Sequence, residues 1–182
     1  YAIERLQKYA EEFRLGDTPG LEITESQPQI SDSDVVRSSI GQGTNNYTTS
    51  GLARYISAVA NEGTVYNLSL FDKTTDVNGN LVKDYEPSVR NEVEGIANST
   101  WTAVHNGMRR MVTNTSTFNS LGDFELYGKT GTAQQSTTHP NHGLFVGFTS
   151  GQDTNVSFAI RIANGYNSTY PSEIGRDIIR YY

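Results

Sequence analysis

The chain has 182 residues, 14 basic and 20 acidic, with a net charge of −6 and no cysteine. That length suits one domain or a large piece of one, and 11 tyrosines with 7 phenylalanines favour a packed core over disorder. The scattered basic residues argue against nucleic-acid binding, the lack of cysteine excludes disulfides, and no apolar run reaches the roughly 18 residues of a membrane span.

Two helices are expected in the first third of the chain. Apolar residues recur at helical spacing over Ala2–Arg14 and again over about Thr49–Asn61, where Thr48 or Thr49 can serve as N-cap. Between them, residues 22–47 show no clear period. We expect this stretch to form an ordered loop or covering segment.

The middle of the chain predicts short strands and a third helix. Residues 64–84 indicate two strands with a turn at Asn78-Gly79, a dipeptide typical of hairpins. A short helical turn is expected near Pro87–Ala97. Ser99 is a suitable N-cap for the next helix, whose inner face we expect to carry Trp101, Val104, Met108 and Met111.

The pattern then changes to strands. Segments at about 124–133, 144–149 and 156–163 alternate in the manner of strands, and the short loops between them favour an antiparallel meander. A last helix is expected from about Pro171 to Tyr182, with Ile174, Ile178 and a terminal tyrosine on its buried stripe. The fold class is therefore α/β, of the mixed α+β type, with the last helix laid on the sheet.

The run from Tyr127 to Gln134 carries the most chemistry. In a regular strand, Lys129 and Gly131 share one face while Thr130 and Thr132 share the other. On an edge strand, backbone N–H groups, hydroxyls and the lysine could bind an extended peptide with a carboxylate end, and Gly131 would let a ligand backbone approach closely. An ordinary surface strand explains the same residues, whereas a phosphate-binding loop lacks its first glycine.

Lys129-Thr130-Gly131 matches a signature of the penicillin-recognising serine enzymes. Four further blocks resemble class B penicillin-binding proteins in order and rough spacing: Ser39–Gly43, Ala58–Gly63, Trp101 to Met108, and His142 to Phe148. The resemblance covers nearly the whole chain. It implies a partial penicillin-binding-protein/serine β-lactamase-like transpeptidase fold.

Two other motifs of that family are missing. Arg5, Leu70, Asn80 and Leu126 stand three residues before the four lysines, so no Ser-x-x-Lys motif occurs, and Ser-x-Asn is absent as well. We therefore expect residues 1–182 to be the C-terminal part of one transpeptidase domain. Three of the family's five strands would remain in it.

The resemblance also implies roles for individual residues. Lys129 would supply positive potential in the cleft, and the hydroxyls of Thr130 and Thr132 would contact the substrate carboxylate. The N–H of Thr132 would be one donor of the oxyanion hole. Gly131 would belong to the substrate-binding strand, and Gln134 would line the cleft floor or be a plain strand residue.

The implied function of the parent protein is peptidoglycan D,D-transpeptidation by a serine acyl-enzyme, with D-Ala-D-Ala stem peptides and β-lactams as ligands. It would act at the extracytoplasmic face of the membrane, held by an anchor outside this chain, and this chain alone would be inactive. Rival interpretations are a D,D-carboxypeptidase or β-lactamase of the same superfamily, and a non-catalytic module that binds muropeptides or proteins. No cofactor or metal is expected, and His139 with His142 is better explained as a polar loop.

Overall fold

The computed structural model describes residues 2–122, 124–151 and 155–182. The helices are α1 (Ala2–Glu12), α2 (Val35–Ser38), α3 (Thr49–Ala60), α4 (Asn98–Thr113) and α5 (Thr169–Tyr181), with a 3₁₀ turn, η1, at Ser116–Phe118. The strands are β1 (Thr64–Tyr66), β2 (Lys73–Thr75), β3 (Leu81–Asp84), β4 (Val89–Glu92), β5 (Glu125–Ala133), β6 (His142–Ser150) and β7 (Ser157–Ile162).

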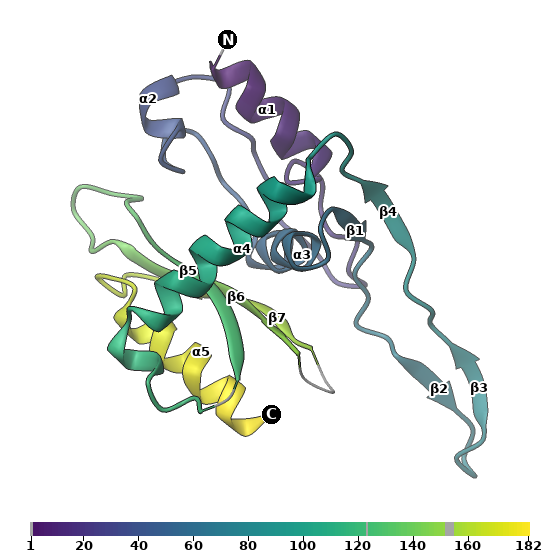
Figure 1. Cartoon of the computed structure of the whole chain (residues 1–182). Coiled ribbons are helices and arrows are strands. Elements are labelled where there is room, and N and C mark those ends of the chain that lie inside the picture. Colours follow the sequence, from purple (N-terminus) through teal and green to yellow (C-terminus); the bar gives the residue numbers. More distant parts are fainter. Residues whose placement is uncertain (1, 123, 152–154) are drawn as a thin grey trace.

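The central sheet has the order β5-β6-β7 and is antiparallel throughout, which confirms the expected meander. Its register is regular along all of β5, from Glu125 opposite Ser150 to Ala133 opposite His142. Because side chains alternate along a strand, each face of the sheet carries a fixed set of residues. In Figure 1, α4 and α5 lie against this sheet from different sides.

Each face of the sheet supports its own apolar cluster. On the side of α3, Phe148 packs with residues of α3 and α4, and its ring stacks on Tyr127 with centroids 4.9 Å apart. On the side of α5, Phe145 and Phe158 pack with Ile179 and with Phe118 of η1. Two buried faces explain why β6 is apolar at successive positions, as the sequence indicated.

The first two helices form as expected. The Thr48 hydroxyl accepts a hydrogen bond from the N–H of Gly51 at 2.9 Å and caps α3. The intervening loop contains the short helix α2 and an isolated bridge between Gln29 and Asn46.

One buried charge was not anticipated. Arg54 of α3 is 1% exposed and donates to the backbone carbonyls of Arg14, Asp17 and Thr18. The guanidinium therefore ties the chain that follows α1 to α3.

Three local expectations were wrong. Residues near Pro87–Ala97 form β4, which pairs with β1, because pairing buries Val65 and Val93 beside the core. The fourth helix starts at Asn98 with Ala97 as an N-cap that makes no side-chain hydrogen bond, so Ser99 is not the cap. Val104 is 40% exposed and does not belong to the inner face of α4.

The stripe predicted for the last helix was also wrong. Ile174 and both terminal tyrosines are exposed, and the buried positions are Pro171, Ser172, Gly175 and Ile179. Gly175 lies so close to Phe145 that a Cβ there would be 2.6 Å from its ring. The close approach rotates the helix away from the register that hydrophobicity alone indicated.

The turn at Asn78-Gly79 is confirmed, but it belongs to a separate ribbon. β2 and β3 pair only with each other among the described residues, and every residue of both strands is exposed. Figure 1 shows this ribbon extending away from the body of the molecule.

Candidate functional site

The strand β5 presents a free edge. It is the first strand in the order β5-β6-β7, so no described strand pairs with its other side. Three side chains donate instead to its carbonyls: Arg109 to Leu126 at 3.1 Å, Lys129 to Thr130 at 2.8 Å, and Gln42 to Thr132 at 3.2 Å. All three carbonyls have even numbers, so the even positions of β5 face the free edge.

The same alternation determines the direction of the N–H groups of β5. In an antiparallel strand the N–H and C=O of one residue point to the same side. The N–H groups of Thr130 and Thr132 therefore point to the free edge, and no side-chain acceptor reaches them within the described residues. The edge thus offers two backbone donors in line, with the ammonium of Lys129 beside them.

The two glycines of this strand differ in whether packing against neighbouring residues requires a glycine. At Gly128 a Cβ would be 2.6 Å from the ring of Phe145, so packing alone demands glycine there. At Gly131 the nearest atom to a Cβ would be the Leu144 Cβ at 3.4 Å, an ordinary contact. The protein interior therefore does not explain the glycine at 131.

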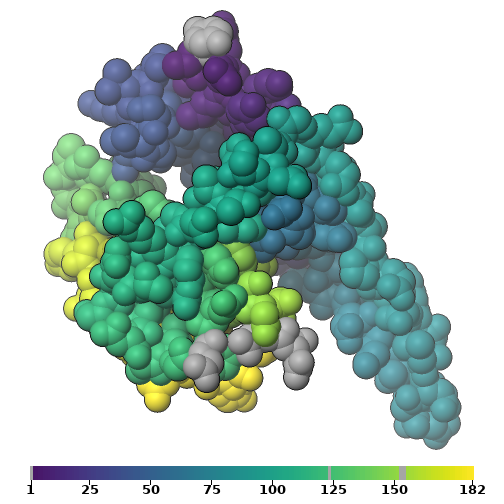
Figure 2. Space-filling view, viewed as in Figure 1, coloured from purple at the N-terminus to yellow at the C-terminus, as the bar shows by residue number. Residues whose placement is uncertain are grey.

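A cavity of about 690 Å³ opens next to the end of β5. One wall is the loop from Gly41 to Thr49, and the other is formed by Ala133, Gln134 and Gln135. Figure 2 shows the surface hollowed between the blue segment that carries α2 and the light-green loop between β5 and β6. Gln134 lies just past the end of β5 and lines this cavity, so it is not a strand residue.

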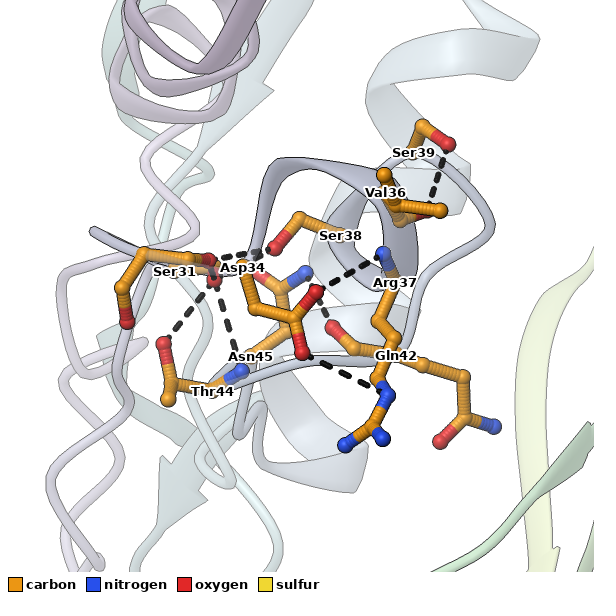
Figure 3. A network of polar contacts seen from close by, with 10 residues as sticks. Ser31, Asp34, Val36, Arg37, Ser38, Ser39, Gln42, Thr44 and Asn45 are labelled. Carbon is orange, nitrogen blue, oxygen red and sulfur yellow. Dashed lines mark hydrogen bonds and ion pairs between the residues drawn. The ribbon is translucent and has the colours of Figure 1, made fainter.

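A network of hydroxyl and amide groups holds the loop with Gln42 in place (Figure 3). Ser31 is fully buried, and its hydroxyl lies 2.6 Å from that of Ser38 and 2.9 Å from that of Thr44. Asn45 accepts from the N–H of Ser31 and donates to the carbonyl of Gln42. The residues next to Gln42 are therefore fixed from behind, while its own carboxamide reaches across to β5.

His142 lies at the base of the same cavity. Its Nδ1 accepts the N–H of Asn164 at 3.0 Å, and its Nε2 contacts the amide oxygen of Gln135 and lies 3.1 Å from a guanidinium nitrogen of Arg161. Burial, and then the positive charge of Arg161, lower the pKa of His142 below its usual value. The imidazole is thus held neutral at pH 7.

The residues expected to form the site occupy one continuous part of the edge. Lys129, Thr130, Gly131 and Thr132 lie consecutively on the edge strand, and Gln134 follows at the cavity. Sequence reasoning missed the contact between Gln42 and Thr132, which joins positions 90 residues apart. It also missed Arg161, which lines the cavity from β7.

Within the described residues, no group of three or more His, Cys, Asp or Glu side chains is placed to bind a metal ion. His139 contacts Thr138 and Ser136 in the loop that follows β5. None of the helices in the described ranges is long and apolar enough to span a membrane.

Comparison with known proteins gives the same picture over nearly the whole chain. Residues 2–180 match the family model described as the penicillin binding protein transpeptidase domain. Penicillin-binding protein 2B of Streptococcus pneumoniae strain R6 is 26% identical over 207 aligned residues, which cover 100% of this chain and 29% of that protein.

Solved structures show the same fold at low identity. PBPA from Mycobacterium tuberculosis superposes with a TM-score of 0.82 at 17% identity, covering 98% of this chain and 47% of that one. Pseudomonas aeruginosa PBP2 in complex with WCK 5153 gives a TM-score of 0.75 at 23% identity, covering 97% of this chain and 42% of that one. The imipenem acyl-enzyme complex of the M. tuberculosis protein gives 0.81 at 19% identity, covering 98% and 43%.

The chain spans 29% of the length of the curated relatives and less than half of each of these solved chains. The match over residues 2–180 nevertheless includes both apolar clusters, the edge strand and the cavity. This chain therefore belongs to the penicillin-binding protein transpeptidase domain family.

Proposed function

We propose that β5 is the substrate-binding strand of a peptidoglycan D,D-transpeptidase and that its free edge holds the D-Ala-D-Ala end of a stem peptide. The observation that carries this proposal is the alternation of carbonyl acceptors along β5, which turns the N–H groups of Thr130 and Thr132 outward. An extended peptide can add to such an edge through backbone hydrogen bonds.

Each residue of the strand then has a distinct task. Lys129 and the hydroxyls of Thr130 and Thr132 receive the terminal carboxylate, since Lys129 has no ion-pair partner in the described part of the chain. The N–H of Thr132 stabilises the oxyanion that develops at the scissile carbonyl. Gly131 lets the ligand backbone approach, and Gln134 lines the region beyond.

The nucleophile is a serine outside these 182 residues. Its Oγ attacks the carbonyl carbon between the two D-alanines, the C–N bond breaks, and the terminal D-alanine leaves with a proton. The amine of a second stem peptide then attacks the ester and releases the serine. A β-lactam opens its ring amide by the first step and keeps the serine acylated.

We therefore propose that residues 1–182 are the C-terminal part of a transpeptidase domain and that they work only together with the rest of it. No Ser-x-x-Lys motif occurs in the chain, which supports this division. The complete protein acts on peptidoglycan at the outer face of the cytoplasmic membrane.

Labelling with a fluorescent penicillin tests the proposal. Two polypeptides are compared: this chain, and one that also carries the upstream part of the domain. We expect label on the longer polypeptide only. Label on the shorter one would place the nucleophile within these residues and contradict the proposal, and label on neither would favour a non-catalytic module that binds muropeptides.

Two variants of the longer polypeptide sharpen this test. Lys129→Ala should slow acylation at least tenfold, because it removes the positive charge from the edge. Lys73→Ala removes an exposed lysine from the ribbon and should leave the rate unchanged. Equal rates for both variants would remove Lys129 from the proposed site, and product analysis would separate transfer to an amine from hydrolysis.

A further inference from the structure

We propose that the cavity beyond β5 is a subsite for a carboxylate on the stem peptide, upstream of the cleaved bond, and that Arg161 is its partner. This inference rests on the proposed function, because it needs the peptide to lie along the edge of β5. The residue that makes the contact is on β7, two strands away from that edge.

The floor of the cavity connects the edge to Arg161. Gly131 lies opposite Leu144, and Leu144 lies opposite Arg161, so these three residues form one row across the sheet and share the same face. Neighbouring strands are about 4.8 Å apart, which puts the Cα of Arg161 about 10 Å from that of Gly131. Gly131 has no side chain and Ala133 only a methyl group, so the side chains on this floor are those of Leu144 and His142 from β6.

The direction of the peptide leads into the same cavity. With its terminal carboxylate beside Lys129, a peptide antiparallel to β5 passes Thr132 and then reaches Ala133 and Gln134. Alternate side chains of an added strand point to one face of the sheet. An upstream side chain on the α3 face therefore points over the floor of the cavity, which Arg161 also lines.

Among the described residues, the only charged side chain that lines the cavity is the positively charged Arg161. The lining contains amide, hydroxyl and apolar side chains, one tyrosine, one neutral histidine and Arg161, but no carboxylate. The adjacent Glu25 is turned elsewhere, since one of its oxygens accepts from the N–H groups of Gly20 and Leu21 at 2.8 and 2.9 Å. A ligand carboxylate would meet no repulsion from the lining residues.

The guanidinium of Arg161 keeps its donors available. Within the described residues, its one hydrogen-bond contact is with Nε2 of His142. Because Nδ1 accepts from Asn164, the proton of the neutral imidazole lies on Nε2. That nitrogen then faces Gln135 as a donor and offers Arg161 no lone pair. Arg161 is exposed and forms no ion pair with any described carboxylate, so a planar carboxylate from a ligand is its natural partner.

The test compares two peptides on the longer polypeptide, which also carries the upstream part of the domain. Both end in D-Ala-D-Ala and differ only in one upstream side chain, which bears a carboxylate in the first and a carboxamide in the second. Calorimetric titration gives the two dissociation constants. We expect the carboxylate peptide to bind about tenfold more tightly, the scale of one charge-assisted hydrogen-bond pair.

Two variants with the same loss of charge assign the effect. Arg161→Gln should abolish the tenfold preference while binding the carboxamide peptide like the unchanged chain. Arg110→Gln, an exposed position on α4 outside the cavity, should keep the preference. A preference that survives in Arg161→Gln would overturn the assignment.

The outcomes also separate the two proposals. Equal binding of both peptides to the unchanged chain would overturn the carboxylate subsite and leave the substrate strand standing. No binding of either peptide would overturn peptide addition to β5, and the subsite with it. A shift of the Arg161 Nε–H resonance with the carboxylate peptide, and none with the carboxamide peptide, would place the contact directly.

Discussion

Replacing Gly43 by alanine should weaken the loop that carries Gln42. Gly43 has φ +75°, and a Cβ there would be 2.6 Å from the hydroxyl oxygen of Ser38 and 3.3 Å from that of Ser31. An alanine in this left-handed region costs about 1 kcal/mol. Moving Ser38 breaks its buried hydrogen bond to Ser31, which contributes about 1 kcal/mol more. We expect Gly43→Ala to lower the free energy of unfolding by about 2 kcal/mol.

The neighbouring glycine provides the control. Gly41 has φ +78°, yet nothing lies within 4 Å of its potential Cβ. Gly41→Ala should therefore cost only the backbone strain, about 1 kcal/mol. Urea unfolding of both variants, followed by circular dichroism, gives the two free energies. Equal losses in the free energy of unfolding would mean that Ser31 and Ser38 can move apart without destabilising the chain. The argument from packing against Ser38 would then be refuted.

Three further results are expected. Gly128→Ala should destabilise the chain by about 1–3 kcal/mol in urea unfolding because its methyl group collides with the ring of Phe145. Gly131→Ala should not destabilise the chain but should weaken peptide binding. A larger loss of stability in Gly131→Ala than in Gly128→Ala would contradict the assignment of the free edge. Arg54→Met should cost about 2–4 kcal/mol in the same assay, since buried carbonyls lose their donors; a neutral result would show that water replaces the guanidinium. The lowered pKa of His142 means that its stabilising contribution is complete above pH 6.5 and is lost as pH falls through its folded-state pKa. The free energy of unfolding, measured at pH 5.5 and 7.5, should therefore change less in His142→Gln than in the unchanged chain. Equal changes in the two proteins would show that this linkage is wrong.

Local patterns predicted the central sheet well. Alternation and apolar runs marked β5, β6 and β7, and short loops indicated their antiparallel order. The Lys129-Thr130-Gly131 motif lies within the strand that was predicted at about 124–133, and that strand is at the edge of the sheet. These features depend on residues close in the sequence, which is why periodicity and motif spacing were sufficient.

Features that depend on distant contacts were not predictable. β4 forms because its pairing with β1 buries Val65 and Val93, and a single-sequence pattern holds no record of that partner. The rotation of α5 follows from the close packing of Gly175 against Phe145, which a hydrophobic stripe does not encode. Arg161 looked like one outward residue of an alternating strand until the register placed it across the sheet from Gly131.

The ribbon of β2 and β3 provides a site for chemical labelling of this domain. Val77 at its tip is fully exposed at 101% of its reference area, and no residue of either strand enters the two apolar clusters. A cysteine introduced at that tip would be the only thiol in the chain, because the sequence contains none. Fluorophores or surface-attachment chemistry could therefore be placed there with a single substitution, far from the cavity and without protecting any other side chain.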